Sequence, residues 1–302
     1  MKSNKTIGIL FLILVGILGL IGGKFLWQKR NNDVSDQEYQ QRLKGLDKKE
    51  IVAIQLQKGD EKLDLATDEQ TEQWMVGGVI ANAEQVSSLL NVIKKPTGLM
   101  IVAETKNKHN DFQITDEEAT KLKITSNGNQ TDVALVTLLL GANSGGGRYI
   151  RFEGDDRVYL VKGLSGEMIS TTQDDWIDKV IVKIDQESIT KIEISSSKTK
   201  VSLEQKESKW YKTGTNEEVG KEPLSPILMT LESLVVKGLR KDGERNNYTT
   251  NPTTTVKIEQ QSGGTITLEF YSGKEDGLVK SSQSDVWYKI STSTMEKFDI
   301  KI

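Results

Sequence analysis

Residues 51–65 read IVAIQLQKGDEKLDL, and residues 189–203 read ITKIEISSSKTKVSL. In each stretch aliphatic side chains alternate with polar ones, which is the pattern of a strand with one buried face, and a polar break separates two such strands. Each stretch therefore predicts an antiparallel hairpin. The aliphatic positions recur at one constant offset: Ile51, Ile54, Leu56, Leu63 and Leu65 correspond to Ile189, Ile192, Ile194, Val201 and Leu203.

A tryptophan and then an amphipathic helix follow each predicted hairpin. Trp74 and Trp210 are related by nearly the same offset, and we expect each to seat the helix that comes after it. We expect Asn82 to cap the first helix, and Ser225 followed by Pro226 to begin the second. The apolar residues recur at i, i+3, i+4 and i+7, the spacing of one helix face: Val86, Leu89, Leu90 and Ile93, then Leu224, Ile227, Leu228 and Leu231.

Further strand patterns follow in both halves, over residues 122–161 and 256–288, so the order strand, strand, tryptophan, helix, several strands occurs twice. A sheet that buries one face of a helix is an α+β layer. The predicted fold class is α+β: an N-terminal transmembrane helix followed by two duplicated lobes of antiparallel sheet, each with a helix packed on it. The predicted segments are an anchor at 1–30, a polar linker at 31–48, a first lobe at 49–182 and a second lobe at 183–302.

The anchor prediction rests on the segment from Ile7 to Gly23, which reads IGILFLILVGILGLIGG and holds no charged side chain. A helix over Thr6–Trp27 spans roughly 33 Å, enough for a hydrocarbon core of about 30 Å. The run is longer than the apolar region of a cleaved signal peptide, about 7–15 residues, and Ile21 stands where a cleavage site needs a small residue. We therefore expect a retained single-pass anchor in the cell membrane.

Five glycines lie on one side of this predicted helix. At 100° per residue they fall within an arc of about 120°, and Gly19 and Gly23 have the spacing that lets two membrane helices approach closely. Glycine is also frequent in membrane helices that have no partner, so two interpretations remain: a bare anchor, or a helix that packs against a multi-spanning transporter subunit. The proposed packing face consists of Gly8, Gly16, Gly19, Gly22 and Gly23.

Charge is divided unevenly between the anchor and the rest of the chain. The formal net charge is −3, and residues 1–30 carry five basic and no acidic side chains, so the remainder carries −8. An acidic surface does not replace the counterions of nucleic acid, and we expect no nucleic-acid partner. Basic residues flank the apolar stretch on both sides. We expect a cytoplasmic N-terminus and an extracytoplasmic bulk, because long domains cross the membrane largely regardless of charge.

Several kinds of chemistry lack the residues that they need. The chain has no Cys, which excludes disulfides, thiolate metal sites and thiol nucleophiles. Its one histidine, His109, lies in a polar connection where we expect a solvated side chain. The stretch Gly141–Arg148 reads GANSGGGR, lacks the Lys-Ser/Thr of a phosphate loop and continues as a strand, so it predicts a hairpin connection.

Two pairs of adjacent acids, Asp155-Asp156 and Asp174-Asp175, are the candidates for carboxylate catalysis or metal binding. Neighbouring residues on a strand point to opposite faces, so neither pair converges by itself. The run Lys237–Arg245 mixes both signs of charge, as a solvated loop does. We expect no catalytic residue, no cofactor and no metal ion.

The chain resembles the bacterial membrane-anchored family called domain of unknown function 4340. The resemblance covers most of residues 49–240 and departs from the family pattern at Gln113, where Gly is usual, and at Asn82, where Asp is common. It implies an envelope protein, often associated with ABC-type export systems of the kind linked to gliding motility, and it carries over no catalytic residues. Its motifs are Ile51-x-x-Ile54, Trp74, Ala81-Asn82-Ala83-x-x-Val86, Phe112-Gln113-Ile114, Leu139-Leu140-Gly141, Tyr149-Ile150-Arg151 and Val158-Tyr159-Leu160-Val161.

Three hypotheses of function follow. The leading one is a non-enzymatic extracytoplasmic scaffold or accessory subunit of an ABC-type transport or envelope complex. The alternative is an envelope glycan- or peptide-binding module, which needs an exposed aromatic platform at Tyr149 and Tyr159 or at Trp287 and Tyr288. The second alternative is a carboxylate-dependent hydrolase, which needs two acids from different strands in one cleft.

Overall fold

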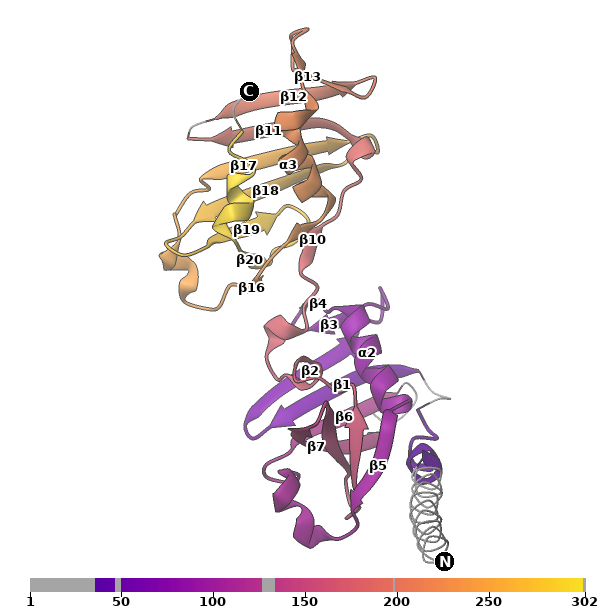
Figure 1. Cartoon of the computed structure of the whole chain (residues 1–302). Helices are drawn as coiled ribbons and strands as arrows, with labels where there is room; N and C mark the ends of the chain where they lie inside the picture. Colours follow the sequence, from indigo (N-terminus) through magenta and orange to yellow (C-terminus); the bar gives the residue numbers. More distant parts are fainter. Residues whose placement is uncertain (1–35, 47–49, 127–133, 198, 301–302) are drawn as a thin grey trace, which may run out of the picture. The chain divides into compact units, whose positions relative to one another are not determined.

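The computed structural model describes residues 36–46, 50–126, 134–197 and 199–300 (Figure 1). The described chain divides into two compact units, one ending at Trp176 and one starting at Ile177. Each unit is built on one large antiparallel sheet of nine strands, and helices are few. The α+β class predicted from the alternation of strand and helix patterns is confirmed.

The first unit contains a sheet in the order β4-β3-β2-β1-β6-β7-β8-β9-β5. One α-helix, α2 (Ala83–Lys94), lies across a face of this sheet in Figure 1. Short 3-10 turns occupy the connections at Lys106–Lys108, Asn110–Phe112, Glu167–Ile169 and Gln173–Asp175. The strands are β1 (Ile51–Lys58), β2 (Glu61–Thr67), β3 (Trp74–Val76), β4 (Val79–Ile80), β5 (Thr97–Ala103), β6 (Thr120–Ser126), β7 (Val136–Ser144), β8 (Gly147–Phe152) and β9 (Val158–Lys162).

The second unit contains a sheet in the order β14-β13-β12-β11-β17-β18-β19-β20-β16, crossed by helix α3 (Lys221–Glu232). A short ladder joins β10 (Val180–Val182) to β15 (Leu234–Val235), and α4 (Thr292–Glu296) comes near the C-terminus. Further 3-10 turns lie at Gln186–Ser188 and Glu244–Asn247. The sheet strands are β11 (Ile189–Ser196), β12 (Lys200–Lys206), β13 (Lys209–Lys212), β14 (Glu218–Val219), β16 (Gly238–Leu239), β17 (Thr254–Gln260), β18 (Thr265–Ser272), β19 (Gly277–Ser281) and β20 (Trp287–Ile290).

The two sheets have the same topology. In each, the first two strands form a hairpin, and its first strand also pairs with a later strand, β6 in the first sheet and β17 in the second. A strand that follows the helix, β5 or β16, lies at the far edge of its sheet. The register agrees as well: Ile54 faces Leu65, and its counterpart Ile192 in the second unit faces Leu203. The predicted hairpins and the repeated order of elements are both present.

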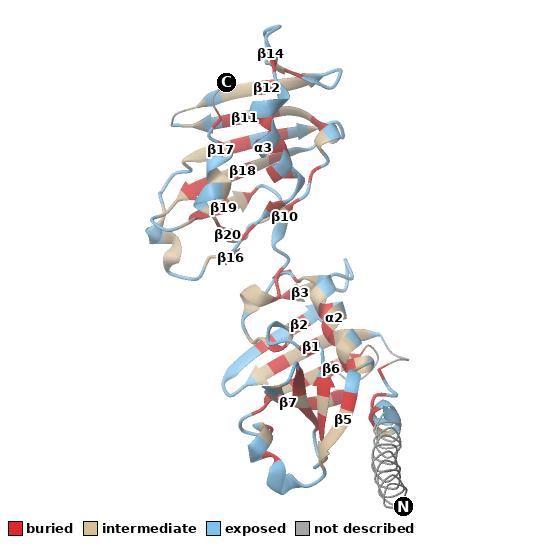
Figure 2. Ribbon diagram, in the orientation of Figure 1, coloured by how far each residue is buried: buried red, intermediate tan, exposed pale blue. Residues whose placement is uncertain are grey.

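The two helices bury the predicted apolar faces (Figure 2). In α2 the buried residues are Val86, Leu89 and Ile93, and the Asn82 side chain accepts a hydrogen bond from the Gln85 backbone at 3.0 Å, as a helix cap does. The predicted start of α3 at Ser225 is wrong. The helix begins at Lys221 and contains Pro226, because the buried stripe already starts at Leu224 and its burial outweighs the hydrogen bond that proline removes.

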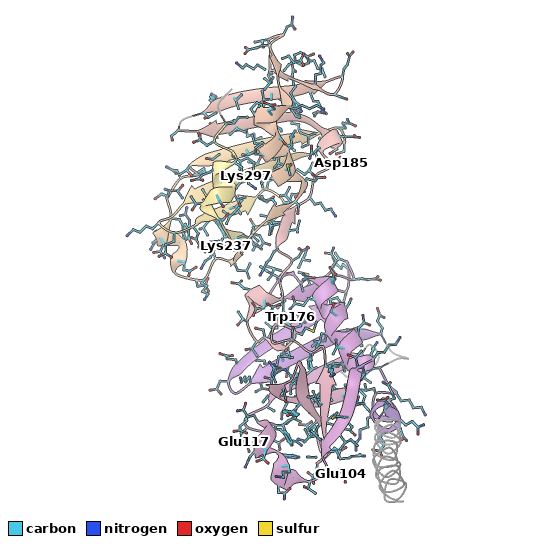
Figure 3. All side chains as sticks on the ribbon, viewed as in Figure 1. Glu104, Glu117, Trp176, Asp185, Lys237 and Lys297 are labelled. Atoms are coloured by element: carbon cyan, nitrogen blue, oxygen red, sulfur yellow. The ribbon has the colours of Figure 1, made fainter. Side chains whose placement is uncertain are left out.

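Among the described residues of the first unit, the buried tryptophan is Trp176, which is fully enclosed (Figure 3). Trp74, expected to seat the helix, is only half-buried, whereas Trp210 is buried as expected. The Trp176 indole donates to the Ser170 carbonyl at 2.8 Å, and the Trp176 carbonyl accepts from the Asn82 amide at 2.7 Å. The segment that leaves the first unit is therefore fixed to the start of α2.

Truncating this side chain tests its role. We expect Trp176→Ala to lower the free energy of unfolding of the first unit by about 3–5 kcal/mol, because it leaves a large cavity. Urea unfolding of the full-length protein in detergent micelles, followed by circular dichroism, measures the loss. Trp74→Ala, which truncates the half-buried ring, is the matched control and has a smaller cost. A loss below about 1 kcal/mol for Trp176→Ala contradicts the assignment.

Candidate functional site

The predicted glycine face, Gly8 to Gly23, and the whole predicted anchor lie outside the residues that the structure describes. Among residues 36–300, apart from the short gaps, no helix is long and apolar enough to cross a membrane. The described chain begins instead with a short helix over residues 36–42 and a turn that runs to residue 46. How this segment is held is the most informative feature of the first unit.

Residues 36–46, which the sequence places in a polar linker, pack on the first unit. Tyr39, Leu43 and Leu46 are each at most 2% exposed, and they recur at i, i+4 and i+7 across the short helix and the turn that follows it. The sequence assigns 31–48 to a polar spacer, whereas residues 36–46 pack on the first unit. We call residues 36–46 the docking segment.

The docking segment caps the C-terminal end of α2. The last carbonyls of a helix lack partners within the helix. The Tyr39 hydroxyl donates to the Ile93 carbonyl at 3.0 Å, and the Gln40 amide donates to the Lys94 carbonyl at 2.8 Å. Two orphaned acceptors of α2 are thus satisfied by side chains from the docking segment.

An aromatic cluster lies beneath this contact. The Tyr39 ring lies 5.3 Å from the Phe152 ring and 5.5 Å from the Tyr159 ring, and Phe152 meets Tyr159 edge-on at 6.0 Å. These separations suit favourable edge-to-face packing. Burial raises the pKa of both tyrosine hydroxyls above the ordinary value, so both remain neutral at physiological pH.

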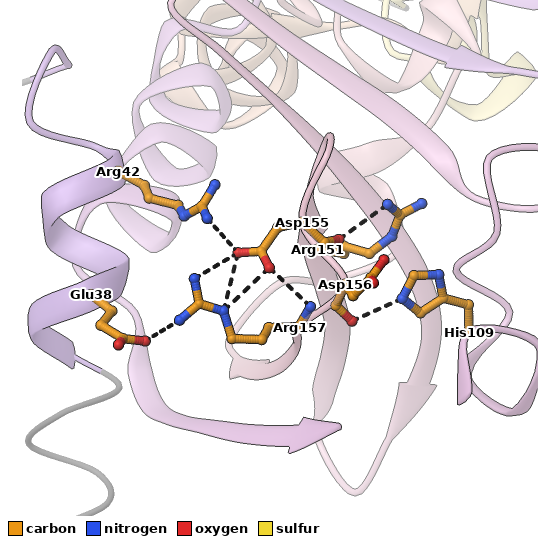
Figure 4. A network of polar contacts seen from close by, with 7 residues as sticks. All are labelled: Glu38, Arg42, His109, Arg151, Asp155, Asp156 and Arg157. Atoms are coloured by element: carbon orange, nitrogen blue, oxygen red, sulfur yellow. Dashed lines mark hydrogen bonds and ion pairs between the residues drawn. The ribbon is translucent and has the colours of Figure 1, made fainter. Parts of the chain in front are cut away.

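Ion pairs connect the docking segment to the turn that carries Asp155 and Arg157 (Figure 4). Asp155 is 9% exposed and lies between two guanidinium groups. Arg42 reaches its carboxylate at 2.7 Å, and Arg157 donates to it from Nη2 at 3.0 Å and from Nε at 3.2 Å. Arg157 also pairs with Glu38, so two ion pairs, Arg42–Asp155 and Glu38–Arg157, join the docking segment to the turn before β9. The four charges form one network in which each acid faces at least one arginine.

The network controls the ionisation of Asp155. Burial by itself would raise the pKa of this carboxyl group, but the hydrogen bonds from Arg157 and the positive charges of Arg42 and Arg157 outweigh burial. The pKa of Asp155 therefore lies below its ordinary value. The same hydrogen bonds raise the pKa of Arg157.

Two further side chains, those of His109 and Arg151, contact the backbone of the turn that carries Asp155. The expectation that His109 is solvated is wrong: this side chain is 3% exposed, and its Nε2 lies 2.9 Å from the Asp156 carbonyl. A carbonyl only accepts, so Nε2 carries the hydrogen. Arg151 donates to the Asp155 carbonyl at 3.3 Å and pairs with Asp116 at 2.7 Å. His109 and Arg151 thereby fix the backbone that positions the Asp155 carboxylate.

The other candidate residues of the sequence lie in the β7–β8 hairpin and in connections of the first unit. The stretch Gly141–Arg148 forms the predicted β7–β8 hairpin, with Gly145 and Gly146 at positive φ in its turn. Asp175 accepts from the Ser170 hydroxyl at 2.5 Å. Asp156 has an exposed side chain, and it does not converge with Asp155. Within the described ranges, no group of three or more His, Asp or Glu side chains has an arrangement that could hold a metal ion.

Neither aromatic pair suggested for glycan binding consists of two exposed rings, since Tyr149 and Trp287 are half-buried. Tyr159 and Tyr288 are buried, and Tyr149 packs on Phe112 with ring centroids 4.4 Å apart. The Trp287 ring faces two guanidinium groups, those of Arg240 at 5.7 Å and Arg245 at 5.1 Å. The run Lys237–Arg245, expected to be a solvated loop, is therefore partly stacked on aromatic rings.

Comparison with known proteins places the chain in a family. The profile of the family described as "Domain of unknown function (DUF4340)" matches residues 74–253, more than half of the chain. The chain belongs to this family. The resemblance drawn from its motifs is confirmed. No curated protein and no solved structure shows significant similarity to the chain. In this DUF4340 protein the matched region includes Asp155 and Arg157, and the docking segment lies before it.

Neutralising Asp155 tests the network in this DUF4340 protein. Asp155→Asn leaves Arg42 and Arg157 without their common anion, and we expect it to reduce the stability of the docked state by about 1–3 kcal/mol. Hydrogen exchange of residues 36–46 in the full-length protein measures the change. Asp156→Asn, the adjacent exposed acid, is the matched control and leaves exchange unaltered. Equal exchange in both variants contradicts the role assigned to Asp155.

The lowered pKa of Asp155 also predicts a pH dependence. A carboxyl group with a depressed folded pKa stabilises the fold above its unfolded pKa of about 4, and that contribution disappears as the pH falls through the folded value. The difference in melting temperature between wild type and Asp155→Asn should be largest above about pH 4 and shrink below it. Thermal melts from neutral to acidic pH measure this difference, and a constant difference is the contrary result.

Proposed function

We propose that this protein is a membrane-anchored, extracytoplasmic, non-enzymatic scaffold or accessory subunit, in which the docking segment joins the first unit firmly to the anchor. The observation that carries the proposal is the burial of Tyr39, Leu43 and Leu46 so soon after the apolar stretch. A spacer that did not contact the unit would leave these three apolar side chains in solvent and would not cap a helix. The docked segment favours a fixed position of the first unit at the membrane.

The short reach of the connection supports this proposal. Twelve residues, 24–35, separate the apolar stretch from the helix over 36–42. Even fully extended, they span at most about 40 Å. The acidic remainder of the chain, at −8, is repelled by anionic headgroups, so contact with lipid does not compete with contact to protein. A partner in the same membrane is the natural target of a unit held at this distance.

The glycine face supplies the partner contact in this proposal. Small residues let helix backbones approach closely in lipid, where no hydrophobic driving force exists between helices. We infer a multi-spanning membrane protein as partner, and an exporter permease of ABC type is the candidate that the family resemblance implies. The units outside the membrane then present two broad sheets beside it.

Affinity purification from membranes tests the proposal. The full-length protein should recover a multi-spanning partner, and Gly16→Leu, Gly19→Leu and Gly23→Leu together should reduce recovery by about tenfold, since leucine separates the helix backbones. Leu10→Ala, Ile17→Ala and Ile21→Ala, on the opposite face of the expected helix, form the control and keep recovery. Recovery of the monomer alone, or unchanged recovery with the leucine variant, contradicts the proposal.

A further inference from the structure

The first unit contains a cavity of about 670 Å³ that the docking segment does not touch. Its walls come from the β1–β2 hairpin, the connection that precedes β6, the β7–β8 hairpin and residues 166–175. The volume lies within the range of small-molecule sites in proteins, about 300–1,000 Å³. One wall of the cavity carries a charge that the protein itself does not neutralise.

That charge is the guanidinium group of Arg148, which is 8% exposed and lines the cavity. Its Nη1 donates to the Gly141 carbonyl at 2.6 Å, whereas its buried Nε has no hydrogen-bond partner. Arg148 forms no ion pair with an acid in the described part of the chain. The register of the β7–β8 ladder shifts between Leu140 and Asn143, a bulge that frees Gly141 to receive the side chain.

Arg151, on the same strand, shows what a structural arginine looks like in this protein. It is also buried, but it pairs with Asp116 and donates to the carbonyls of Ile114 and Asp155. Arg148 has one carbonyl in place of these three partners. Burying a charge without a counter-charge is costly, and it lowers the pKa of Arg148. A group that costs the free protein stability at a cavity wall is typical of a binding residue.

The charges on the rest of the cavity wall restrict which charges the ligand can carry. Four carboxylates line it together with Lys58, so an inorganic dianion would meet more negative than positive charge. Two of them are already oriented, since Glu61 accepts from the Thr171 hydroxyl at 2.6 Å and Asp175 from Ser170. A ligand with a carboxylate at one end and a cation at the other satisfies both sets of charges. The carboxylates are those of Glu61, Glu118, Glu167 and Asp175.

We propose that this cavity binds a zwitterionic amino acid or short peptide, with its carboxylate on Arg148 and its ammonium group among the surrounding carboxylates. The planar guanidinium fork matches a carboxylate, which would supply the counter-charge that Arg148 lacks in the free protein. The proposal adds a ligand to the scaffold and does not depend on the membrane partner, because the cavity lies within the first unit. It needs no covalent chemistry.

Titration calorimetry of the full-length protein in detergent micelles tests the site. The probes are L-alanine and trialanine as zwitterions of two lengths, with acetate, methylammonium and inorganic phosphate as single-charge comparisons. We expect saturable binding of at least one zwitterion, at least about tenfold tighter than any comparison probe. A higher affinity for trialanine than for alanine identifies a peptide as the ligand, and a higher affinity for alanine identifies a free amino acid.

Three variants separate the site from a general effect on folding. Arg148→Met should abolish binding and leave the melting temperature of the free protein unchanged or higher, since it removes an unpaired buried charge. The exposed Glu118→Gln should weaken zwitterion binding and spare acetate binding. Glu153→Gln, an exposed acid outside the cavity, is the control and leaves binding intact.

Four results overturn the proposal. They are the absence of saturable zwitterion binding, zwitterion affinity that Arg148→Met leaves unchanged, phosphate affinity equal to or above that of the zwitterions, and insensitivity to Glu118→Gln. The last of these does not depend on whether the Arg148 variant folds.

Discussion

The buried carboxylate of Asp155, held between Arg42 and Arg157, is the constraint on which the arrangement of the first unit depends. Arg42 comes from the docking segment and Arg157 from the approach to β9, so one acid joins the start of the described chain to the β8–β9 connection, near one edge of the sheet. Beneath it, Tyr39 packs on Phe152 and Tyr159 and caps α2. A buried acid with two cations is stable only while both remain in place, which links the position of the docking segment to the integrity of the sheet.

Much of the fold was predictable because its determinants are local and periodic. Strand alternation at residues 51–65 and 189–203 identified both hairpins, and the constant offset between their aliphatic positions anticipated the shared topology. The cap at Asn82 follows from a single side chain and its own helix. The start of α3 was misjudged since a cap-and-proline pattern at Ser225 competes with an apolar stripe that begins at Leu224, and tertiary burial decides such a contest.

The site was harder to predict from the sequence, because the residues that contact one another there are distant in sequence. His109 looks solvated in a polar stretch, and only the Asp156 carbonyl, 47 residues away, explains its burial. The stripe of Tyr39, Leu43 and Leu46 did carry a local signal, a helical period within a charged segment, that was sufficient to predict docking. Arg148 carried none: a charge after a glycine-rich turn predicts a solvated hairpin, and its burial depends on how four separate segments enclose the cavity.

The docking segment is fixed on the first unit in the full-length protein, and its position can be measured. The chain has no cysteine, so spin labels can be introduced at two positions without removing any residue that reacts with them. Electron–electron double resonance between labels at the exposed residues Gln41 and Ser87, in lipid bilayers, measures the distance directly. The account predicts one narrow distance distribution. A broad distribution, with the helix over 36–42 free of the unit, would contradict it.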